Sequence, residues 1–413
     1  MGLVQGGLNG RRFRITTPLP EGFRDRYLQG VREFAFQPRL DATDKEPTVG
    51  WVDIFEAANT KFELNTFLFD RYLALALRSD KKSVNGRYAK IALYEREQQV
   101  MEERGLEKLS KDDKEALKEA VEAELFARAL PSVSTTDVVW DTVSGQVIVF
   151  GTSDSQVEIV VENFEATFDV RLRPERMADW LHDKLAWDEI VERTERFLPG
   201  ARGGAGTEGF VDGHRMDDPL ENVELPLAAD FITWLWLQSE ASDGLFRVID
   251  GDGVKTAVEE VEDGWNDVTE TLKRADLTLW LENRLKLQDV DPHDDVPETT
   301  ILLGAAPTTS DNARRDLHTG KRPVQACLGM KLEDLEIAME LAATDAGLSI
   351  AGLKLPFEVK KGTDEKIFER MMLLDLVHTT LKQLFTQFFL ARTSPAWEER
   401  VNAWITNEIL AAK

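Results

Sequence analysis

The densest group of side chains that could do chemistry lies in the segment DVDPHDDVPE, which holds Asp291, His293, Asp294 and Asp295. Paired carboxylates can hold the magnesium ions with which a nuclease cleaves DNA. A run of this composition is more often a solvated acidic loop, and we favour that interpretation. We therefore predict no metal site and no catalytic residue in this segment.

Other chemical signatures are incomplete. The glycine-rich run at 200–209 is not followed by Lys and Ser or Thr, so it does not form a phosphate-binding P-loop. The run DGDGVK, which starts at Asp250, begins like a calcium loop but lacks a later ligand and the required glycine. The single cysteine, Cys327, excludes an internal disulfide and a cysteine-based zinc site. We expect no cofactor.

Charge is distributed unevenly along the chain. The formal net charge is -25 and the pI is near 4.7, so the molecule as a whole repels phosphate groups. From Arg78 to Arg128, by contrast, 12 Lys/Arg residues balance 12 Asp/Glu residues. This balanced stretch can approach a polyanion where the rest of the chain cannot.

The balanced stretch is predicted to form two charged helices, 85–104 and 111–129, that lead into a β-hairpin. Ser110, with Asp113 three residues later, is a weak capping box at the start of the second helix. Helices that are charged on most faces tend to project from a domain. The hairpin is expected from strands 136–143 and 146–151, joined at Ser144-Gly145. We call residues 84–130 the predicted arm.

The remaining periodicities predict an α+β fold with mixed or antiparallel sheets, a projecting two-helix arm, a central β-meander and a helical C-terminus. Further strands are expected at 11–16, 48–54, 66–79, 170–175, 277–288, 299–304, 323–330, 335–342 and 348–355. Further helices are expected at 21–36, 155–168, 229–240, 363–391 and 395–410.

Composition and breaks in the pattern predict several domains. The chain has 413 residues, 42% hydrophobic and 30% charged, which is ordinary for a globular protein. The apolar runs are too short for a membrane span and no signal peptide is visible, so we expect a cytoplasmic protein. The predicted parts are an N-terminal α+β domain at 1–198 with the arm at about 84–130 and the hairpin at 136–151, a glycine-rich linker at 199–215, a sheet domain at 216–362 and C-terminal helices at 363–413.

Several segments resemble those of one protein family. The main one is the order of charged helix, LFARALPSVSTT, VVWDTVSGQVIVF and acidic helix, in which Trp140-Asp141-Thr142 with Gly145 is the most specific part. AFQPR at 35–39, VGWVD at 49–53 and the run from the Gly-Lys pair through three strands at 316–355 add to it. On these residues the chain resembles the recombination-associated protein RdgC family, over about 11–175 and 311–357.

The resemblance implies a ring-shaped homodimer that encircles double-stranded DNA without sequence preference and modulates RecA-dependent recombination. It also implies an association with the nucleoid in the cytoplasm. Phosphate contacts supply such affinity and need only a basic inner rim. For each candidate residue, an ordinary solvated charge stays the alternative. The candidates are Arg78, Lys81, Lys82, Arg87 and Arg128 on the arm, Leu130 at its end, and Arg314, Arg315, Lys321 and Arg322 as a second patch.

The sequence departs from the family pattern at two places. The family has an aromatic finger after an Arg-Ala pair, whereas Arg128-Ala129 is followed here by Leu130 and Pro131. Leu130 could still act as an apolar wedge. The family's Lys-Gln pair that contacts DNA falls near Gly304–Pro307, where the sequence GAAP has no charge.

Two other functions stay open. The acidic loop at 291–295, with the exonuclease label that families of this kind carry, is compatible with a magnesium-dependent DNA exonuclease. The charge of -25 and the uncharged GAAP are compatible with an acidic protein-interaction scaffold that has lost DNA binding. We favour the DNA-binding protein without enzymatic activity.

Overall fold

The computed structural model is of the α+β class with antiparallel sheets, as the sequence predicts. The chain divides into two units. The first comprises Met1–Pro18, Ser144–Thr152 and Arg171–Lys413, and the second comprises Leu19–Val143 and Ser153–Val170. The structure describes residues 2–4, 7–15, 17, 19–39, 46–151, 153–198, 210–211, 214–215, 218–241, 245–246, 277–289, 298–304, 306–332, 335–354 and 365–411.

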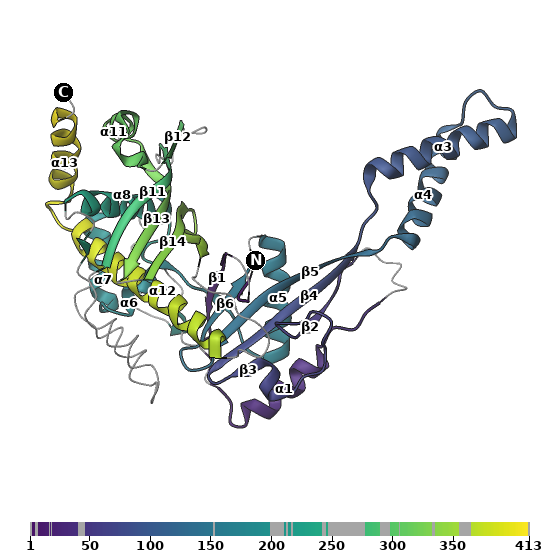
Figure 1. Cartoon of the computed structure of the whole chain (residues 1–413), viewed down its shortest axis with the longest axis horizontal. Coiled ribbons are helices and arrows are strands. Elements are labelled where there is room, and N and C mark those ends of the chain that lie inside the picture. Colours follow the sequence, from purple (N-terminus) through teal and green to yellow (C-terminus); the bar gives the residue numbers. More distant parts are fainter. Residues whose placement is uncertain are drawn as a thin grey trace. The chain divides into compact units, whose positions relative to one another are not determined.

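The second unit is built on a long antiparallel ribbon (Figure 1). β4 (Tyr72–Lys82) and β5 (Pro131–Asp141) pair along their full length. β2 (Thr48–Val52) pairs with β4, as does β3 (Leu68–Phe69), which follows the short helix α2 (Leu64–Phe67). Residues 72–77 of β4 are buried, whereas residues 78–82 are partly or fully exposed. The ribbon therefore starts in the core and ends outside it.

Helices α1 (Phe23–Glu33) and α5 (Asp154–Phe168) pack on the buried end of the ribbon. Trp140 of β5 is 1% exposed, and its ring centre lies 5.3 Å from that of Tyr27 of α1. Phe164 and Phe168 of α5 each lie 5.6 Å from Trp140, nearly edge to face. Such pairs contribute beyond the area that they bury. This aromatic cluster fixes the strand on which the exposed end of the ribbon depends.

At its exposed end the ribbon leads into α3 (Gly86–Arg104) and α4 (Lys111–Arg128), which we call the helical pair (Figure 1). Asn85 accepts hydrogen bonds from the backbone N–H groups of Arg87 and Tyr88 and so begins α3. Ser110 accepts one from the N–H of Asp113 and donates its hydroxyl to the Asp113 carboxylate. The predicted cap at Ser110 is thus confirmed.

The helical pair has almost no core of its own. α3 buries none of its side chains, and α4 buries only Val121. Leu109, between the helices, is also buried. Ion pairs from Lys114 to Glu97 and from Arg104 to Asp113 link the two helices. Exposed ion pairs are individually weak, so caps and a thin apolar seam hold the pair together.

The described strands of the first unit are antiparallel. β1 (Arg11–Arg14) pairs with β6 (Gln146–Phe150) and with β7 (Arg173–Pro174). A larger sheet has the strand order β10-β11-β13-β14-β15, with β12 on β11. Its strands are β10 (Leu245–Phe246), β11 (Leu277–Gln288), β12 (Thr299–Gly304), β13 (Arg322–Leu332), β14 (Leu335–Thr344) and β15 (Gly347–Lys354).

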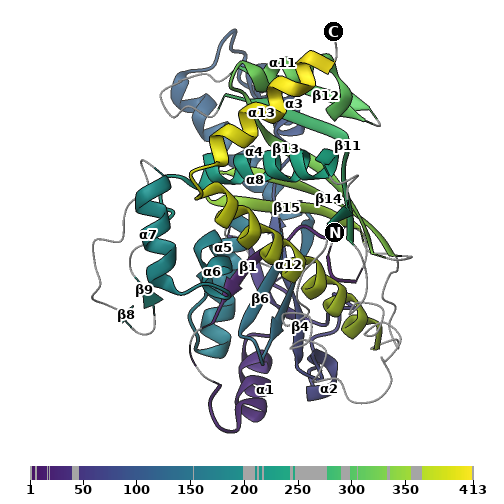
Figure 2. The same ribbon diagram turned by 90° about the vertical axis from the view of Figure 1, so that its left-hand side faces the viewer.

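Helices cover the larger sheet (Figure 2). α8 (Glu224–Ala241) lies across its strands and buries Phe231, whose ring centre lies 5.3 Å from that of Phe385 of α12 (Glu365–Arg392). The remaining elements are α6 (Met177–His182), α7 (Trp187–Phe197), β8 (Phe210–Val211), β9 (His214–Arg215), the 3-10 helix Pro307–Thr309, α11 (Asp311–His318) and α13 (Trp397–Ala411).

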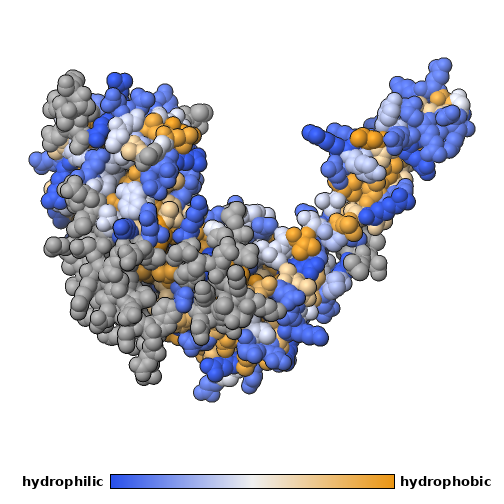
Figure 3. Space-filling model, viewed as in Figure 1, coloured by the Kyte–Doolittle hydropathy of each residue, from blue (hydrophilic) through white to orange (hydrophobic). Residues whose placement is uncertain are grey.

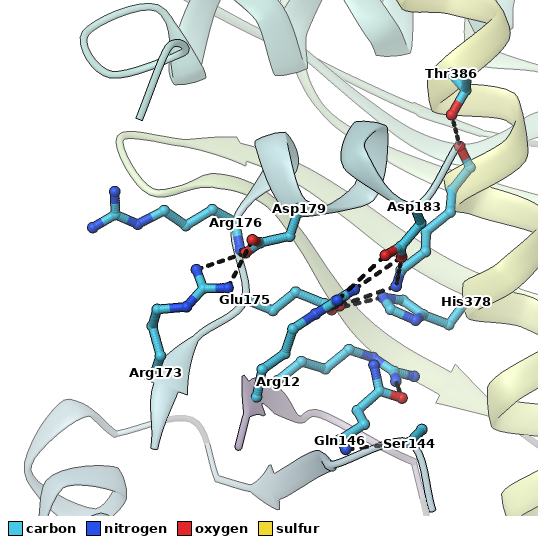
Figure 4. A network of polar contacts seen from close by, with 12 residues as sticks. Arg12, Ser144, Gln146, Arg173, Glu175, Arg176, Asp179, Asp183, His378 and Thr386 are labelled. Atoms are coloured by element: carbon cyan, nitrogen blue, oxygen red, sulfur yellow. Dashed lines mark hydrogen bonds and ion pairs between the residues drawn. The ribbon is translucent and has the colours of Figure 1, made fainter. Parts of the chain in front are cut away.

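A buried ionic network joins α12 to the strands and helices at the start of the first unit (Figure 4). Glu175 lies 3.0 Å from His378 Nε2 and 3.0 Å from Lys382 Nζ, both on α12. Arg14 of β1 lies 2.9 Å from Glu175 and 2.9 Å from Asp183, which also contacts Lys382. Both carboxylates thus contact Arg14 and Lys382. The Glu175 side chain is buried and requires such partners, whereas Asp183 is exposed.

The network shifts the pKa values of its members strongly. Burial alone would raise the pKa of Glu175, but His378, Lys382 and Arg14 hold it well below its usual range. Burial, and after it the nearby Arg12, lower the pKa of His378 to about 3. His378 is therefore neutral at physiological pH. The positive charges that compensate the Glu175 carboxylate are those of Lys382 and Arg14. No pattern in the sequence indicates this network.

Most predicted elements are present within a few residues of their expected bounds. The strand expected at 66–79 is wrong at its start, because α2 ends at Phe67 and the chain turns at Asp70, where φ is 56°. No glycine or proline marks that turn in the sequence. The strand expected at 170–175 is only β7, and α6, α7 and α11 were not predicted.

Gly145 has a φ of 71°, which suits the tight turn predicted at Ser144-Gly145. Most of the linker at 199–215, and the whole DGDGVK run from Asp250, lie outside the described residues. The domain boundaries stay a prediction. Within the described ranges, no helix combines the length and the apolar character that crossing a bilayer requires.

We predict that Trp140→Ala lowers the free energy of unfolding by about 3–5 kcal/mol, because it leaves a cavity among the rings of Tyr27, Phe164 and Phe168. Trp140→Phe should cost much less, since Phe keeps most ring contacts and the Trp140 Nε1–H has no hydrogen-bond partner in the described structure. Tyr94→Ala, at a side chain that is 63% exposed, is the control and should change it by less than about 0.5 kcal/mol. Urea denaturation measures all three. Equal losses for Trp140→Ala and Tyr94→Ala would contradict the aromatic cluster's role.

We predict that acid destabilises the first unit through His378. Its folded pKa of about 3 lies below the unfolded value, so between the two the unfolded state binds a proton that the folded state does not. Stability is then complete above about pH 6.5 and falls as the pH is lowered, by up to about 1.4 kcal/mol per pH unit. His378→Gln should flatten the dependence between about pH 5 and 6.5 in denaturation curves. An unchanged slope in this variant would show that His378 is not the titrating group.

Candidate nucleic-acid interface

The predicted arm candidates gather where the ribbon meets the helical pair. Lys81 and Lys82 end β4, and Lys82 lies opposite Pro131 in the β4–β5 register. Arg87 is in the first turn of α3, and Arg128 ends α4. Because Pro131 pairs opposite Lys82, the chain comes back to the end of β4 after the helical pair. Leu130, which directly precedes Pro131, is thereby brought to the end of the ribbon that carries Lys81 and Lys82. Residues far apart in sequence so meet at one end of the ribbon.

Arg78 is bound within the second unit. Its guanidinium donates to both carboxylate oxygens of Asp80 at 2.7 Å and to the backbone oxygen of Ala57 at 3.0 Å. It also lies 4.3 Å from the ring centre of Phe36. These contacts use most of its donors. Arg78 is better placed to brace β4 than to reach a phosphate.

The other cations of the predicted arm are more accessible. Lys81 and Arg87 are exposed and, within the described part of the chain, have no carboxylate at ion-pair distance. Lys82 is half-buried. Arg128 is exposed but pairs with Glu124 one turn earlier at 2.9 Å. The least compensated positive charge therefore lies between the end of β4 and the first turn of α3.

Leu130 is 88% exposed at the junction of α4 and β5. Val133, two residues into β5, is 50% exposed. Figure 3 shows apolar surface beside hydrophilic surface on this part of the molecule. An exposed leucine at a strand start contributes nothing to the core, so its position is compatible with the predicted apolar wedge.

The second patch is in the first unit, and acidic residues compensate most of it. Lys321 lies 3.2 Å from Glu298 and 3.6 Å from Asp316, and these contacts raise its pKa, with Glu298 the main cause. Arg314 pairs with Glu240 on α8 at 3.5 Å, and Arg322 pairs with Asp230 at 3.7 Å. Arg315 is exposed. The patch therefore offers one exposed arginine rather than four free cations.

Two further segments were considered in the sequence, GAAP at 304–307 for DNA contact and the acidic segment at 291–295 for catalysis. Gly304 ends β12, Pro307 is buried at the start of a 3-10 helix, and the sequence GAAP carries no charge. Asp291, His293, Asp294 and Asp295 lie outside the described residues. Among the residues that the structure does describe, no group of three or more His, Cys, Asp or Glu side chains is arranged to hold a metal ion.

The positive charge near the end of β4 is concentrated in one short segment that the sequence-based expectations did not include. From Lys81 to Tyr94 the chain has four cations, Lys81, Lys82, Arg87 and Lys90, and no Asp or Glu. We call these 14 residues the acid-free segment. Counting charge over the whole of 78–128 conceals it, because the acidic residues of the helical pair cluster later in α3 and in α4.

Comparison with known proteins covers the part of the chain that carries this interface. Residues 9–196 match the family model described as "Putative exonuclease, RdgC". No curated protein matches the chain. The match includes the β4–β5 ribbon, the helical pair and the segment from Trp140 to Gly145 on which the resemblance rests, whereas the resembling run at 316–355 lies beyond it. Residues 9–196, a little under half of the chain, are thus similar to the RdgC family.

Proposed function

We propose that the chain is a sequence-nonspecific double-stranded DNA-binding protein that encircles DNA as a homodimer and modulates RecA-dependent recombination. The similarity of residues 9–196 to the RdgC family supports an association with DNA and recombination. The observation that carries the proposal is the acid-free segment, with Lys81 and Arg87 exposed and unpaired in the described structure. Its DNA contacts are made to phosphates, which all sequences share.

The net charge of -25 does not prevent such binding. At physiological ionic strength, charges farther apart than a Debye length of about 8 Å are largely screened from each other. A phosphate at the acid-free segment therefore interacts with the four local cations more than with carboxylates elsewhere. The acidic remainder discourages DNA from binding at other surfaces.

A homodimer strengthens this mode of binding. In a two-fold dimer each surface occurs twice, so the acid-free segment is present in two copies. Two copies that contact one duplex add their phosphate contacts, and closure around the DNA limits dissociation without any base-specific contact. Within this proposal Lys81, Lys82 and Arg87 contact phosphates, Leu130 packs against the duplex, and Arg315 is the free member of the second patch.

We predict that Lys81→Glu, Lys82→Glu and Arg87→Glu together weaken binding to a plain duplex by at least about tenfold at low salt, because three phosphate contacts are replaced by repulsion. The slope of log affinity against log salt should fall by about 2.7. Fluorescence anisotropy with a labelled duplex over a range of salt concentrations measures both quantities.

The matched control is Lys108→Glu, Lys111→Glu and Lys118→Glu, which changes the charge of the helical pair by the same amount at exposed lysines outside the acid-free segment. Its affinity should stay within about threefold of the wild type. Equal losses in the two variants would mean that overall charge, rather than this segment, determines binding.

The two other functions give distinct outcomes with the same reagents. An exonuclease shortens an end-labelled duplex when magnesium is added, and Asp294→Ala with Asp295→Ala would then abolish cleavage. We expect the duplex to stay intact. A protein-interaction scaffold binds no form of DNA even at low salt, and that result in the wild-type chain would refute the proposed function.

A further inference from the structure

β12 is an edge strand of the larger sheet that lacks the usual protection of such strands. Among the described strands it pairs only with β11, so the backbone groups along its other edge have no strand partner there. Its sequence, TTILLG, has neither a charged residue nor a proline, the residues with which edge strands commonly prevent pairing with another chain. Ile301 and Leu303 are 50% and 75% exposed. A free apolar edge of this kind is suited to pair with a further strand.

Two cations lie directly beside these apolar side chains. In the β11–β12 register, Lys286 is opposite Ile301 and Arg284 is opposite Leu303. Residues opposite each other in an antiparallel pair project to the same face, with Cβ atoms about 5 Å apart. The four side chains therefore form a compact group, which we call the β12 patch. Figure 3 shows apolar surface among hydrophilic surface where Figure 1 labels β12.

The cations of the β12 patch are not compensated. Within the described residues, neither Arg284 nor Lys286 has a carboxylate at ion-pair distance, and the Nε–H of Arg284 is buried without a hydrogen-bond acceptor. Glu282 and Glu340 belong to the same sheet, but each accepts a hydrogen bond from a neutral side chain, a tryptophan and a glutamine respectively. A buried donor without an acceptor is costly. The patch thus combines unsatisfied cationic donors with exposed apolar surface.

We propose that the β12 patch and the free edge beside it bind an extended peptide of a partner protein that carries both carboxylates and apolar side chains. The peptide adds a strand to β12 through backbone hydrogen bonds. Alternate side chains of that strand project to the face of the patch. The apolar ones pack on Ile301 and Leu303, and the carboxylates accept from Lys286 and Arg284, whose long side chains reach across one intervening strand, about 5 Å wide.

The composition of the β12 patch argues against two other occupants. A DNA duplex supplies phosphates for the cations but leaves Ile301 and Leu303 without an apolar contact, and it cannot pair with a strand edge. A second copy of the chain supplies another TTILLG strand, which has no carboxylate, so Arg284 and Lys286 would be desolvated without gaining a partner. An acidic, partly apolar peptide satisfies the cations, the apolar side chains and the backbone edge together.

The test uses the full chain and contains no DNA, because the inference goes beyond the proposed function to a protein partner. A labelled short peptide of alternating valine and aspartate is titrated by fluorescence anisotropy, and the wild-type chain should bind it. The same peptide with lysine in place of aspartate should bind at least about tenfold more weakly, because its charges repel Arg284 and Lys286.

Two variants separate the apolar and the charged parts of the patch. Ile301→Thr with Leu303→Thr should weaken binding of the aspartate peptide by at least about tenfold, because it removes the apolar contact and keeps strand-forming residues. Arg284→Glu with Lys286→Glu should weaken it by at least about tenfold, because attraction becomes repulsion. All four side chains are at least partly exposed, so the variants should fold, and urea denaturation checks this.

The matched control is Lys331→Glu with Lys354→Glu, which makes a similar change of charge at exposed lysines of the same sheet. Its affinity for the aspartate peptide should stay within about threefold of the wild type, because the β12 patch is unchanged. An equal loss in the control and in Arg284→Glu with Lys286→Glu would mean that overall charge determines binding and would overturn the inference.

Other results also overturn it. These are a wild-type chain that does not bind the aspartate peptide, equal binding of the lysine peptide, and unchanged affinity in either patch variant. A dimer that becomes monomeric through Ile301→Thr with Leu303→Thr would show that a second copy covers β12. Loss of duplex affinity in Arg284→Glu with Lys286→Glu, without an effect on the peptide, would assign the cations to DNA. A chain that binds the peptide but no form of DNA refutes only the proposed function.

Discussion

The β4–β5 ladder is the constraint on which the second unit depends. Its eleven paired positions run from the core to the helical pair, so the aromatic cluster around Trp140 fixes one end and Lys82 opposite Pro131 defines the other. A slip of one residue would move every side chain of a strand to the opposite face. Trp140 would then leave its contacts with α1 and α5. The core therefore sets the register in which the exposed cations and Leu130 meet.

The helical pair depends on that ladder because it has little else. α3 buries no side chain, and its exposed ion pairs are weak. Its position is determined by two caps, by Leu109 and Val121, and by the two strands that carry it. An element with so small a core can present most of its side chains to a ligand. The first unit differs in this respect, because the charge of Glu175 is buried there and is compensated by Lys382 of α12 and Arg14 of β1.

Sequence patterns predicted the elements that are long, periodic or capped by recognisable residues. Ser110 with Asp113 marked the start of α4, and Gly145 marked a turn that requires a positive φ. The turn at Asp70 was missed because a non-glycine residue adopts the left-handed region there without a local signal. The buried network was missed for another reason. Glu175 and His378 are about two hundred residues apart, and no local period connects an acid on one element to a histidine on another.

In the candidate site, too, some features have a signal in the sequence and others depend on contacts that no local pattern indicates. Proximity of Lys82 to Leu130 follows from strand pairing and was within reach of the sequence, whereas the bidentate contact of Arg78 with Asp80 depends on side-chain geometry that no spacing reports. Counting charge over the whole of residues 78–128 also hid the acid-free segment. Salt screens exposed charges that are more than about 8 Å apart, so only the charges near a phosphate affect its binding. The relevant quantity is the charge within one Debye length of a phosphate. By that measure a protein of net charge -25 has a positive surface where β4 becomes α3.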